Sequence, residues 1–248
     1  MAYQSIKGKT ALITGGSEGI GFGIAEAFAE AGARVIITGR GPHKLASAKE
    51  RLGEHVQALV HDVRDTDSSP ALIKNTVELH GALDVLVNNA GAALFKPLSE
   101  TTVQEFDLLF GTNVRGLFAL TNTAIPELKK TKGNVINICS ASALRGLHSW
   151  SVYSASKSAV LMLTELWAKE LAPEVRVNAL SPGGVDTPIF DKAFGDKKEE
   201  IMGRVHAQHL MGKAGTPKDI ARAALYLATE DWVTGTNMVV DGGLSHRI

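Results

Sequence analysis

The stretch that decides the fold of this chain is Ala11-Leu12-Ile13-Thr14-Gly15-Gly16-Ser17-Glu18-Gly19-Ile20-Gly21. It starts as a short apolar run and continues into glycines, and residues 20–31 then follow the period of a helix. Glycine has no Cβ atom, so this turn can bend tightly and a bound group can approach its backbone. A helix that begins there offers free N–H groups and a positive dipole end to phosphate. Glycines also form ordinary loops, so the position between a strand and a helix is what predicts a dinucleotide site.

Outward from this turn, short apolar runs alternate with helical patterns along the whole chain. Most of the runs are apolar without alternation, which is typical of parallel strands covered on both faces. The pattern predicts an α/β fold, a single-domain doubly wound sheet of about seven parallel strands with helices on both faces over residues 1–248. The expected strands are 11–14, 34–38, 55–60, 83–87, 134–139, 175–180 and 237–240, and the expected helices include 20–31, 72–80, 103–128, 153–171 and 217–229. Residues 186–212 interrupt the rhythm after a strand end, so we expect a substrate-binding loop or helical insertion there.

Composition narrows the class of protein. The 26 basic and 26 acidic residues cancel, which disfavours nucleic acid or an anionic membrane as a partner. The one cysteine, Cys139, cannot form an internal disulfide and lies in an apolar run, which predicts a buried, inert thiol. The N-terminus lacks the apolar core of a signal peptide, and no apolar stretch reaches the roughly 18 residues of a membrane span. We therefore expect a cytoplasmic protein.

Tyr153 and Lys157 are four residues apart in a helical pattern, so they project from one helix face. A tyrosine normally titrates near pH ~10, and a neighbouring lysine cation favours its phenolate. Ser140 follows the strand predicted at 134–139, at the edge of the sheet where ligands bind, and its hydroxyl could hydrogen-bond a substrate oxygen. Each residue also has an ordinary explanation, an amphipathic helix for the pair and a turn cap for Ser140.

Taken in order, these motifs resemble the short-chain dehydrogenase/reductase family across essentially the full chain. The resemblance is carried by the Gly-x3-Gly-x-Gly spacing of residues 15–21, Asn88-Asn89-Ala90-Gly91, Asn113, Ser140, Tyr153-x3-Lys157, and Pro182-Gly183 with Thr187. It implies hydride transfer between a nicotinamide cofactor and a ketone or secondary alcohol. The implied catalytic residues are Asn113, Ser140, Tyr153 and Lys157. Tyr153 would give or take the proton on the substrate oxygen, and Asn113 would order a water chain that reaches the lysine.

The resemblance also implies a set of cofactor-binding residues. Asp62 would grip the adenine with Val63 beside the ring, Lys157 would hold the nicotinamide ribose, and Thr187 would bond the carboxamide. The whole set is Gly15, Ser17, Gly19, Ile20, Gly21, Arg40, Asp62, Val63, Asn89, Ala90, Gly91, Tyr153, Lys157, Pro182, Gly183 and Thr187.

The end of the second expected strand bears on the choice of nicotinamide. An acid there would bond the ribose 2′-hydroxyl of NAD, but the chain has Gly39 followed by Arg40, whose guanidinium suits a 2′-phosphate. Glu18 argues the other way, because a carboxylate near that phosphate would repel it. We expect NADP(H) to be preferred, with NAD(H) possible.

The substrate is constrained least. Loop positions predict a mainly apolar pocket formed by Ala92, Phe95, Ser142, Leu144, His148, Trp150, Gly184, Phe190 and Met211, which favours a neutral ketone or alcohol. A 3-oxoacyl-(acyl-carrier-protein) reductase stays open because of the basic residues 129–132, as do an NAD-dependent alcohol or sugar dehydrogenase and a nucleotide-binding module without catalysis. We expect no metal site and interpret His206-x2-His209 as surface polar residues. The resemblance implies a homotetramer that pairs the helices at 103–128 and 153–171 and the last strand.

Overall fold

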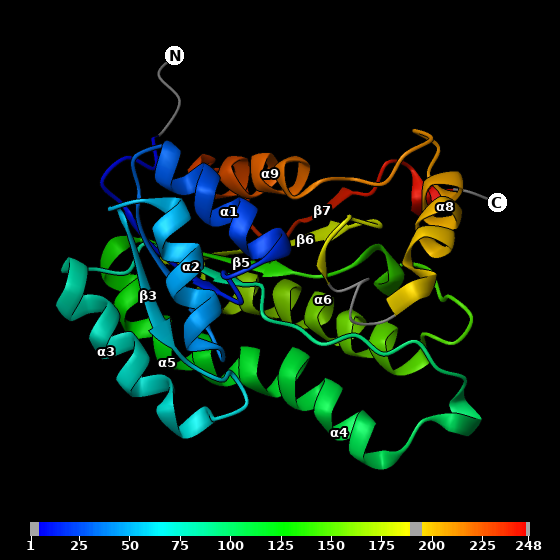
Figure 1. The fold of residues 1–248 in the computed structure, drawn as a ribbon. Coiled ribbons are helices and arrows are strands. Elements are labelled where there is room, and N and C mark those ends of the chain that lie inside the picture. Colours follow the sequence, from blue (N-terminus) through cyan, green and yellow to red (C-terminus); the bar gives the residue numbers. More distant parts are fainter. Residues whose placement is uncertain (1–4, 189–194, 247–248) are drawn as a thin grey trace.

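The computed structural model, which describes residues 5–188 and 195–246, confirms a doubly wound parallel sheet (Figure 1). Its seven strands have the order β3-β2-β1-β4-β5-β6-β7, and every neighbouring pair is parallel. The order in which strands are added reverses between β1 and β4: β2 and β3 extend the sheet on one side of β1, and β4 to β7 extend it on the other. Doubly wound sheets bind ligands at this point. The strands are β1 (Thr10–Thr14), β2 (Arg34–Gly39), β3 (Val56–Val60), β4 (Val85–Asn88), β5 (Asn134–Ile138), β6 (Arg176–Pro182) and β7 (Asn237–Val240).

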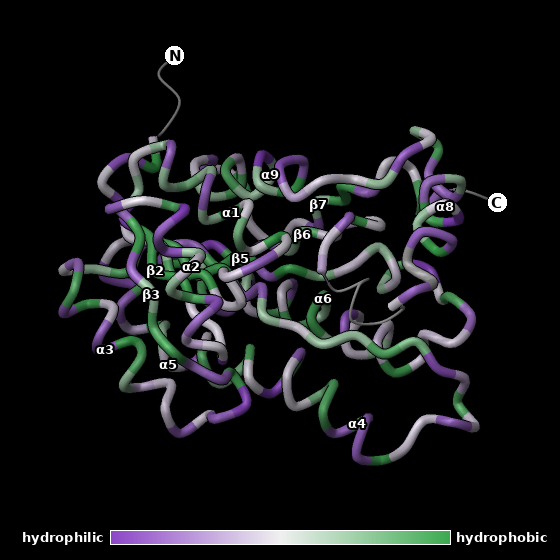
Figure 2. The backbone as a smooth tube through the Cα atoms, viewed as in Figure 1, coloured by the Kyte–Doolittle hydropathy of each residue, from purple (hydrophilic) through white to green (hydrophobic). Residues whose placement is uncertain are grey.

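Helices cover both faces of this sheet. The apolar side chains of α1 (Gly19–Glu30), α2 (Pro42–Leu52) and α9 (Pro217–Thr229) form one core with the strands, and those of α3 (Ser69–His80), α5 (Leu117–Thr131) and α6 (Ser151–Leu171) form another. Figure 2 shows the hydrophobic strands between these layers. The remaining elements are α4 (Val103–Phe110), α8 (Lys198–Gln208), and the short helices η1 (Thr66–Ser68), η2 (Leu98–Glu100), η3 (Gly111–Gly116), η4 (Ala141–Ala143), η5 (Gly195–Lys197) and η6 (Leu244–His246).

Two helical segments differ from the sequence-based expectation. The helix expected over 103–128 is divided into α4, the π-helical η3 and α5. The glycine at the end of η3 allows close packing, since a Cβ on Gly116 would lie 2.4 Å from the carbonyl oxygen of Val63. Helix α2 was not among the helices expected from the sequence; its residues are mostly hydrophilic, and only Leu45 and Ala48 among them are buried.

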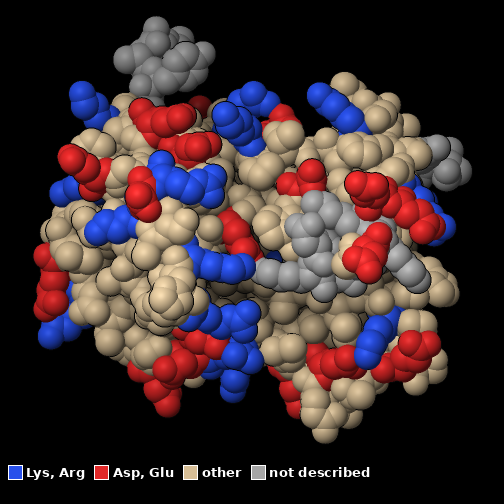
Figure 3. Space-filling view, in the orientation of Figure 1, with Lys and Arg blue, Asp and Glu red and all other residues tan. Residues whose placement is uncertain are grey.

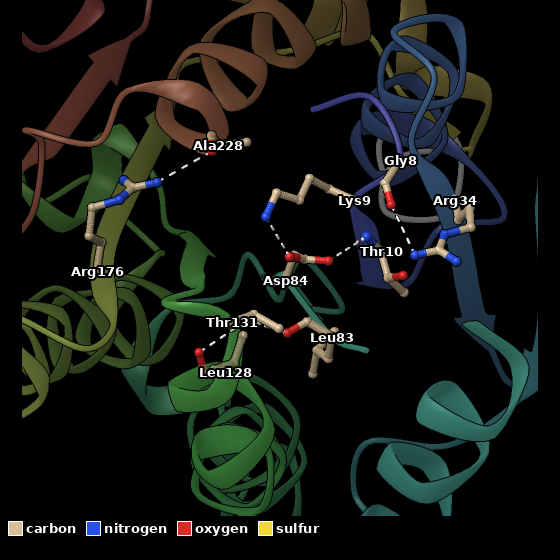
Figure 4. Close-up of polar contacts among 10 residues, drawn as sticks. All are labelled: Gly8, Lys9, Thr10, Arg34, Leu83, Asp84, Leu128, Thr131, Arg176 and Ala228. Atoms are coloured by element: carbon tan, nitrogen blue, oxygen red, sulfur yellow. Dashed lines mark hydrogen bonds and ion pairs between the residues drawn. The ribbon is translucent and has the colours of Figure 1, made fainter. Parts of the chain in front are cut away.

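The amino ends of the strands are joined by polar contacts, many of them drawn in Figure 4. One oxygen of Asp84 accepts a hydrogen bond from Lys9 Nζ at 2.9 Å, and the other accepts from the backbone N–H of Thr10 at 2.8 Å. Arg34 donates to the Gly8 carbonyl, and Arg176 donates to carbonyls at the end of α9. This edge is therefore closed by side chains, whereas the opposite edge carries the candidate site.

Acidic and basic side chains are interspersed over the face shown in Figure 3. Over residues 5–188 and 195–246, no helix combines the length and apolarity required to cross a bilayer.

Candidate active site

A cavity of about 950 Å³ lies at the carboxyl ends of the strands. Its walls come from the segments that follow all seven strands, so residues far apart in the sequence meet there. The expected site residues that line it are Gly15, Ser17, Gly19, Ile20, Arg40, Asp62, Val63, Asn89, Ala90, Gly91, Ala92, Phe95, Ser140, Ser142, Trp150, Tyr153, Lys157, Pro182, Gly183, Gly184 and Thr187.

The glycine turn after β1 requires glycine at particular positions. Gly15 and Gly19 have φ values of 65° and 59°, which residues with a side chain rarely adopt. A Cβ on Gly21 would lie 2.4 Å from the Gly15 carbonyl oxygen, so Gly21 supports the turn from below. Helix α1 begins at Gly19, and Glu18 at its N-cap makes no side-chain capping bond. The first-turn N–H groups of α1 therefore face a cradle that fits a pyrophosphate.

The segment after β4 is fastened to this turn. The backbone N–H groups of Asn89 and Ala90 donate to Thr14 Oγ1 at 3.0 and 2.9 Å, and Asn89 Nδ2 donates to the Thr14 carbonyl at 2.8 Å. These bonds hold both walls of the cavity at a fixed separation.

Tyr153 and Lys157 lie on α6, next to Ser140 at the end of β5. Ser140 Oγ accepts two hydrogen bonds from Ser142, from its N–H at 3.2 Å and its hydroxyl at 3.0 Å, so the Ser140 hydrogen is available for its contact with Tyr153. Lys157 is buried, and its Nζ donates to the Ile138 carbonyl at 2.8 Å.

Desolvation raises the pKa of Tyr153 to about 12, and the hydrogen bond with Ser140 opposes it. Burial also lowers the pKa of Lys157. The effect expected from the sequence, a lysine cation lowering the tyrosine pKa, is not among the causes that act on Tyr153 here. In this structure the desolvation of the phenol changes the pKa of Tyr153 more than the hydrogen bond with Ser140 does.

Asn113 lies behind the cavity wall on the π-helical η3. Its Oδ1 accepts from the Ala92 N–H at 2.8 Å, and its Nδ2 donates to the Ala92 carbonyl and to Ser156 Oγ, both at 2.9 Å. A Cβ on Gly91 would lie 3.4 Å from Asn113 Oδ1 and 3.6 Å from Lys157 Nζ. Asn113 therefore fixes the segment after β4 close to the lysine.

The part of the cavity that follows β1, β2 and β3 is rich in charge. Arg64 donates to both oxygens of Asp62, with a shortest distance of 2.6 Å, and this hydrogen bonding holds the pKa of the Asp62 carboxyl below its usual value. Lys44 forms a 2.7 Å ion pair with Glu18. Arg40 lines the same region.

Several expected pocket residues are placed elsewhere. His148 is exposed, bonds to Ser149 Oγ and does not line the cavity, and the exposed Leu144 and Met211 do not line it either. Phe190 lies outside the described residues.

The sequence-based interpretation of His209 as a surface residue was wrong. His209 is 3% exposed, its Nε2 accepts from the Gly184 N–H at 3.1 Å, and its Nδ1 lies 2.6 Å from the Val205 carbonyl. A Cβ on Gly183, Gly184 or Gly242 would lie 2.9 to 3.2 Å from the imidazole, so these glycines make room for the ring. The one feature of the sequence that could have indicated this packing is the pair of adjacent glycines at 183 and 184, which leave space for a ring against the backbone. No group of three or more metal-ligating His, Cys, Asp or Glu residues occurs within the described ranges.

Comparisons with known proteins agree with this geometry. Residues 15–245 match the family model described as enoyl-(acyl carrier protein) reductase. The NADP-dependent (R)-specific alcohol dehydrogenase of Lentilactobacillus kefiri is 37% identical, over 96% of this chain and 97% of that protein.

Two solved structures from Brucella melitensis are similar over nearly their full length. A short-chain dehydrogenase/reductase described as glucose/ribitol dehydrogenase has a TM-score of 0.90 and 29% identity, covering 98% of this chain and 99% of that one. A 3-ketoacyl-(acyl-carrier-protein) reductase complexed with NADH has a TM-score of 0.91 and 32% identity, covering 97% and 100%. Fold and site define an oxidoreductase with a dinucleotide-type cleft. The chain belongs to the short-chain dehydrogenase/reductase family, whose members use NAD(P)(H).

Proposed function

We propose that this protein transfers a hydride between NADP(H) and a ketone or secondary alcohol, with Tyr153 as general acid and base. The observation that carries the proposal is the position of the Tyr153 hydroxyl. It lies in contact with Ser140, in one cavity that extends from the glycine turn to an uncharged apolar end. When bound there, the nicotinamide supplies or accepts the hydride, and the protein supplies orientation and proton handling.

The chain's own residues divide this work. The first turn of α1 and the glycines before it would hold the pyrophosphate of the cofactor, and Thr187 would bond its carboxamide. The Ser140 hydroxyl donates to the substrate oxygen and stabilises the charge that develops on it. Tyr153 Oη donates its proton to that oxygen during reduction and accepts it during oxidation. Lys157 holds the nicotinamide ribose, and Asn113 keeps the segment after β4 in place beside it.

The charges at the adenosine end support a preference for NADP(H). Glu18, which would repel a 2′-phosphate, is neutralised by Lys44 at 2.7 Å. Arg40 then adds a cation whose planar guanidinium can bond a phosphate at two points. We expect kcat/KM to be higher with NADPH than with NADH and the Arg40→Ala variant to lose much of that difference. A clear NADH preference in the unaltered protein would contradict the preference while leaving the reaction intact.

Replacing Tyr153 by Phe tests the mechanism directly. We expect ketone reduction to fall about 10²–10⁴-fold, because the proton donor is lost. The Kd for NADPH, measured by fluorescence, should stay within a few-fold, since the ring still fills its place. Retained turnover would exclude Tyr153 as the acid, and an unaltered protein that binds NADPH but oxidises it with no carbonyl would indicate a nucleotide-binding module.

A second candidate is reduction of 3-oxoacyl thioesters, which the similarity to a 3-ketoacyl-(acyl-carrier-protein) reductase favours. Steady NADPH oxidation with an acetoacetyl thioester, faster than with simple ketones, would establish it.

We further propose a homotetramer. Exposed apolar side chains on α4, α5 and α6 (Phe106, Leu108, Phe118, Met162 and Leu166) and around α9 and β7 (Tyr226, Trp232 and Val239) supply two candidate contact faces. Trp232 is 93% exposed, which is costly for a free surface. A monomer in sedimentation equilibrium would refute this assembly.

A further inference from the structure

Three aromatic rings form a corner at the reactive end of the cavity. The ring centroids of Phe95 and Trp150 lie 4.2 Å apart, with the two planes tilted by 31°. Both stand nearly edge-on to Tyr153, at 6.0 Å and 75° for Phe95 and at 5.9 Å and 76° for Trp150. Phe95 follows β4 and Trp150 caps the start of α6, so two separate segments bring these rings beside the proton donor. All three residues line the cavity.

The charged lining of the described cavity is concentrated at its other end. Apart from Lys157, the charged residues that line it are Glu18, Arg40, Lys44, Asp62 and Arg64, which follow β1, β2 and β3. Among residues 5–188 and 195–246, the lining beyond Tyr153 is apolar or uncharged and includes Ala93, Leu147, Val185, Val205 and Gln208. His209, also in the lining, has both ring nitrogens engaged by backbone groups.

We propose that the substrate is an uncharged ketone, or the matching secondary alcohol, with a flat apolar ring next to the reacting carbon. The inference rests on the proposed function and names its substrate class. With the carbonyl oxygen at Tyr153 and Ser140, the ring packs on the Phe95–Trp150 pair. Aromatic pairs gain from offset-stacked and edge-on contact beyond the burial of area alone, which a saturated ring obtains only in part.

The same lining disfavours the competing substrate classes. A sugar would bring more hydroxyl groups than Ser142 and Gln208 can pair on walls that are otherwise mainly apolar, and a buried hydroxyl without a partner is costly. Ser142, Leu147 and Gln208 also border a smaller cavity of about 220 Å³, which leaves room for the second substituent of the ketone. Arg145 lines that smaller cavity and is not part of the lining around Tyr153.

The test compares two ketones of equal carbon number with the purified full-length protein and NADPH. Acetophenone has a flat ring, and cyclohexyl methyl ketone has a puckered one. Conjugation makes the acetophenone carbonyl intrinsically less reactive, yet we expect its kcat/KM to be higher by about 3- to 10-fold, the range that aromatic pairing energies allow. Glucose and an acetoacetyl thioester complete the set and should react more slowly than either ketone.

Two variants connect this ratio to the aromatic corner. Trp150→Leu and Phe95→Leu keep an apolar wall but remove a π face, and each should lower the ratio of acetophenone to cyclohexyl methyl ketone at least about 3-fold, mainly through KM for acetophenone. His148→Ala, exposed and outside the cavity, is the matched control and should leave the ratio unchanged. Having two variants keeps the test decisive where one of them fails to fold.

The outcomes separate this inference from the proposed function. An equal or reversed ratio in the unaltered protein, or faster reduction of the thioester or the sugar, overturns the substrate class while hydride transfer stands. Absence of NADPH and NADH oxidation with every carbonyl overturns both.

Discussion

The Tyr153 hydroxyl keeps its proton at neutral pH, because desolvation raises its pKa to about 12 and the hydrogen bond with Ser140 only partly offsets this. Ser140 in turn accepts two hydrogen bonds from Ser142, and these bonds fix the Ser140 hydroxyl relative to Tyr153. At this scale the chemistry depends on three hydroxyl groups from two elements. The buried Lys157, bonded to the Ile138 carbonyl, lies a turn away on α6.

The raised tyrosine pKa predicts different pH profiles for the two directions of reaction. Reduction needs the protonated phenol, which predominates at every pH well below 12, so kcat/KM for a ketone should be nearly flat from about pH 6 to about pH 9. Oxidation needs the phenolate, so kcat/KM for the alcohol should rise with pH, by up to about 10-fold per pH unit. Initial rates in both directions at constant ionic strength measure this. An alcohol oxidation rate independent of pH would contradict the role of Tyr153 as base.

At the scale of elements, the π-helical η3 joins two parts of the cavity wall, the segment after β3 and the segment after β4. Gly116 packs on the Val63 carbonyl, and Asn113 of the same segment binds Ala92 and Ser156. A continuous α-helix would present these residues at different angles. The interruption of the helix is therefore part of the way this site is built.

Gly116→Ala tests this coupling. The new Cβ would lie 2.4 Å from the Val63 carbonyl oxygen, which is backbone and must move, so we expect a loss of about 1–3 kcal/mol in the free energy of unfolding and weaker NADPH binding. Gly203→Ala in α8 is the matched control, because its Cβ would meet nothing within 4 Å. That variant should be neutral or slightly more stable, since alanine favours the helix. Denaturant unfolding and NADPH titration measure both effects, and an unaffected Gly116→Ala protein would contradict the argument.

Across the whole molecule, the two edges of the sheet have different tasks. The carboxyl edge forms the cavity, and the amino edge is closed by Lys9, Asp84, Arg34 and Arg176 (Figure 4). Asp84 joins β1 to the start of β4, directly below the point where the order of the sheet reverses. We therefore expect substitutions at the amino edge to change the free energy of unfolding without changing the turnover of the folded protein.

Asp84→Ala should lower the free energy of unfolding by about 2–4 kcal/mol, because it leaves the buried N–H of Thr10 without its partner. Lys9→Ala is the control. Its side chain is 51% exposed, so its loss should cost less than about 1 kcal/mol. Thermal unfolding and specific activity, measured together, check this prediction. Reduced turnover per folded Asp84→Ala molecule at low temperature would show that the two edges are not independent.

The sequence alone determined the strand–helix alternation, the glycine-rich turn between β1 and α1, and the positions of Tyr153, Lys157 and Ser140 in these elements. These follow from local rules, since apolar period, glycine conformation and helix spacing act over a few residues. The same rules did not single out α2, which is mostly hydrophilic, and the single helix they predicted over 103–128 is interrupted at η3. The cytoplasmic location stays a prediction.

Only the tertiary structure decided which side chains meet. Glu18, expected from the sequence to disfavour NADP(H), forms an ion pair with Lys44. His209, expected on the surface, is buried in the lining of the cavity and accepts a hydrogen bond from the Gly184 N–H. The corner formed by Phe95, Trp150 and Tyr153 likewise joins segments that no local pattern relates. The physical reason is that such contacts depend on strand order and on the packing of loops at one edge of the sheet, which are set by the chain as a whole.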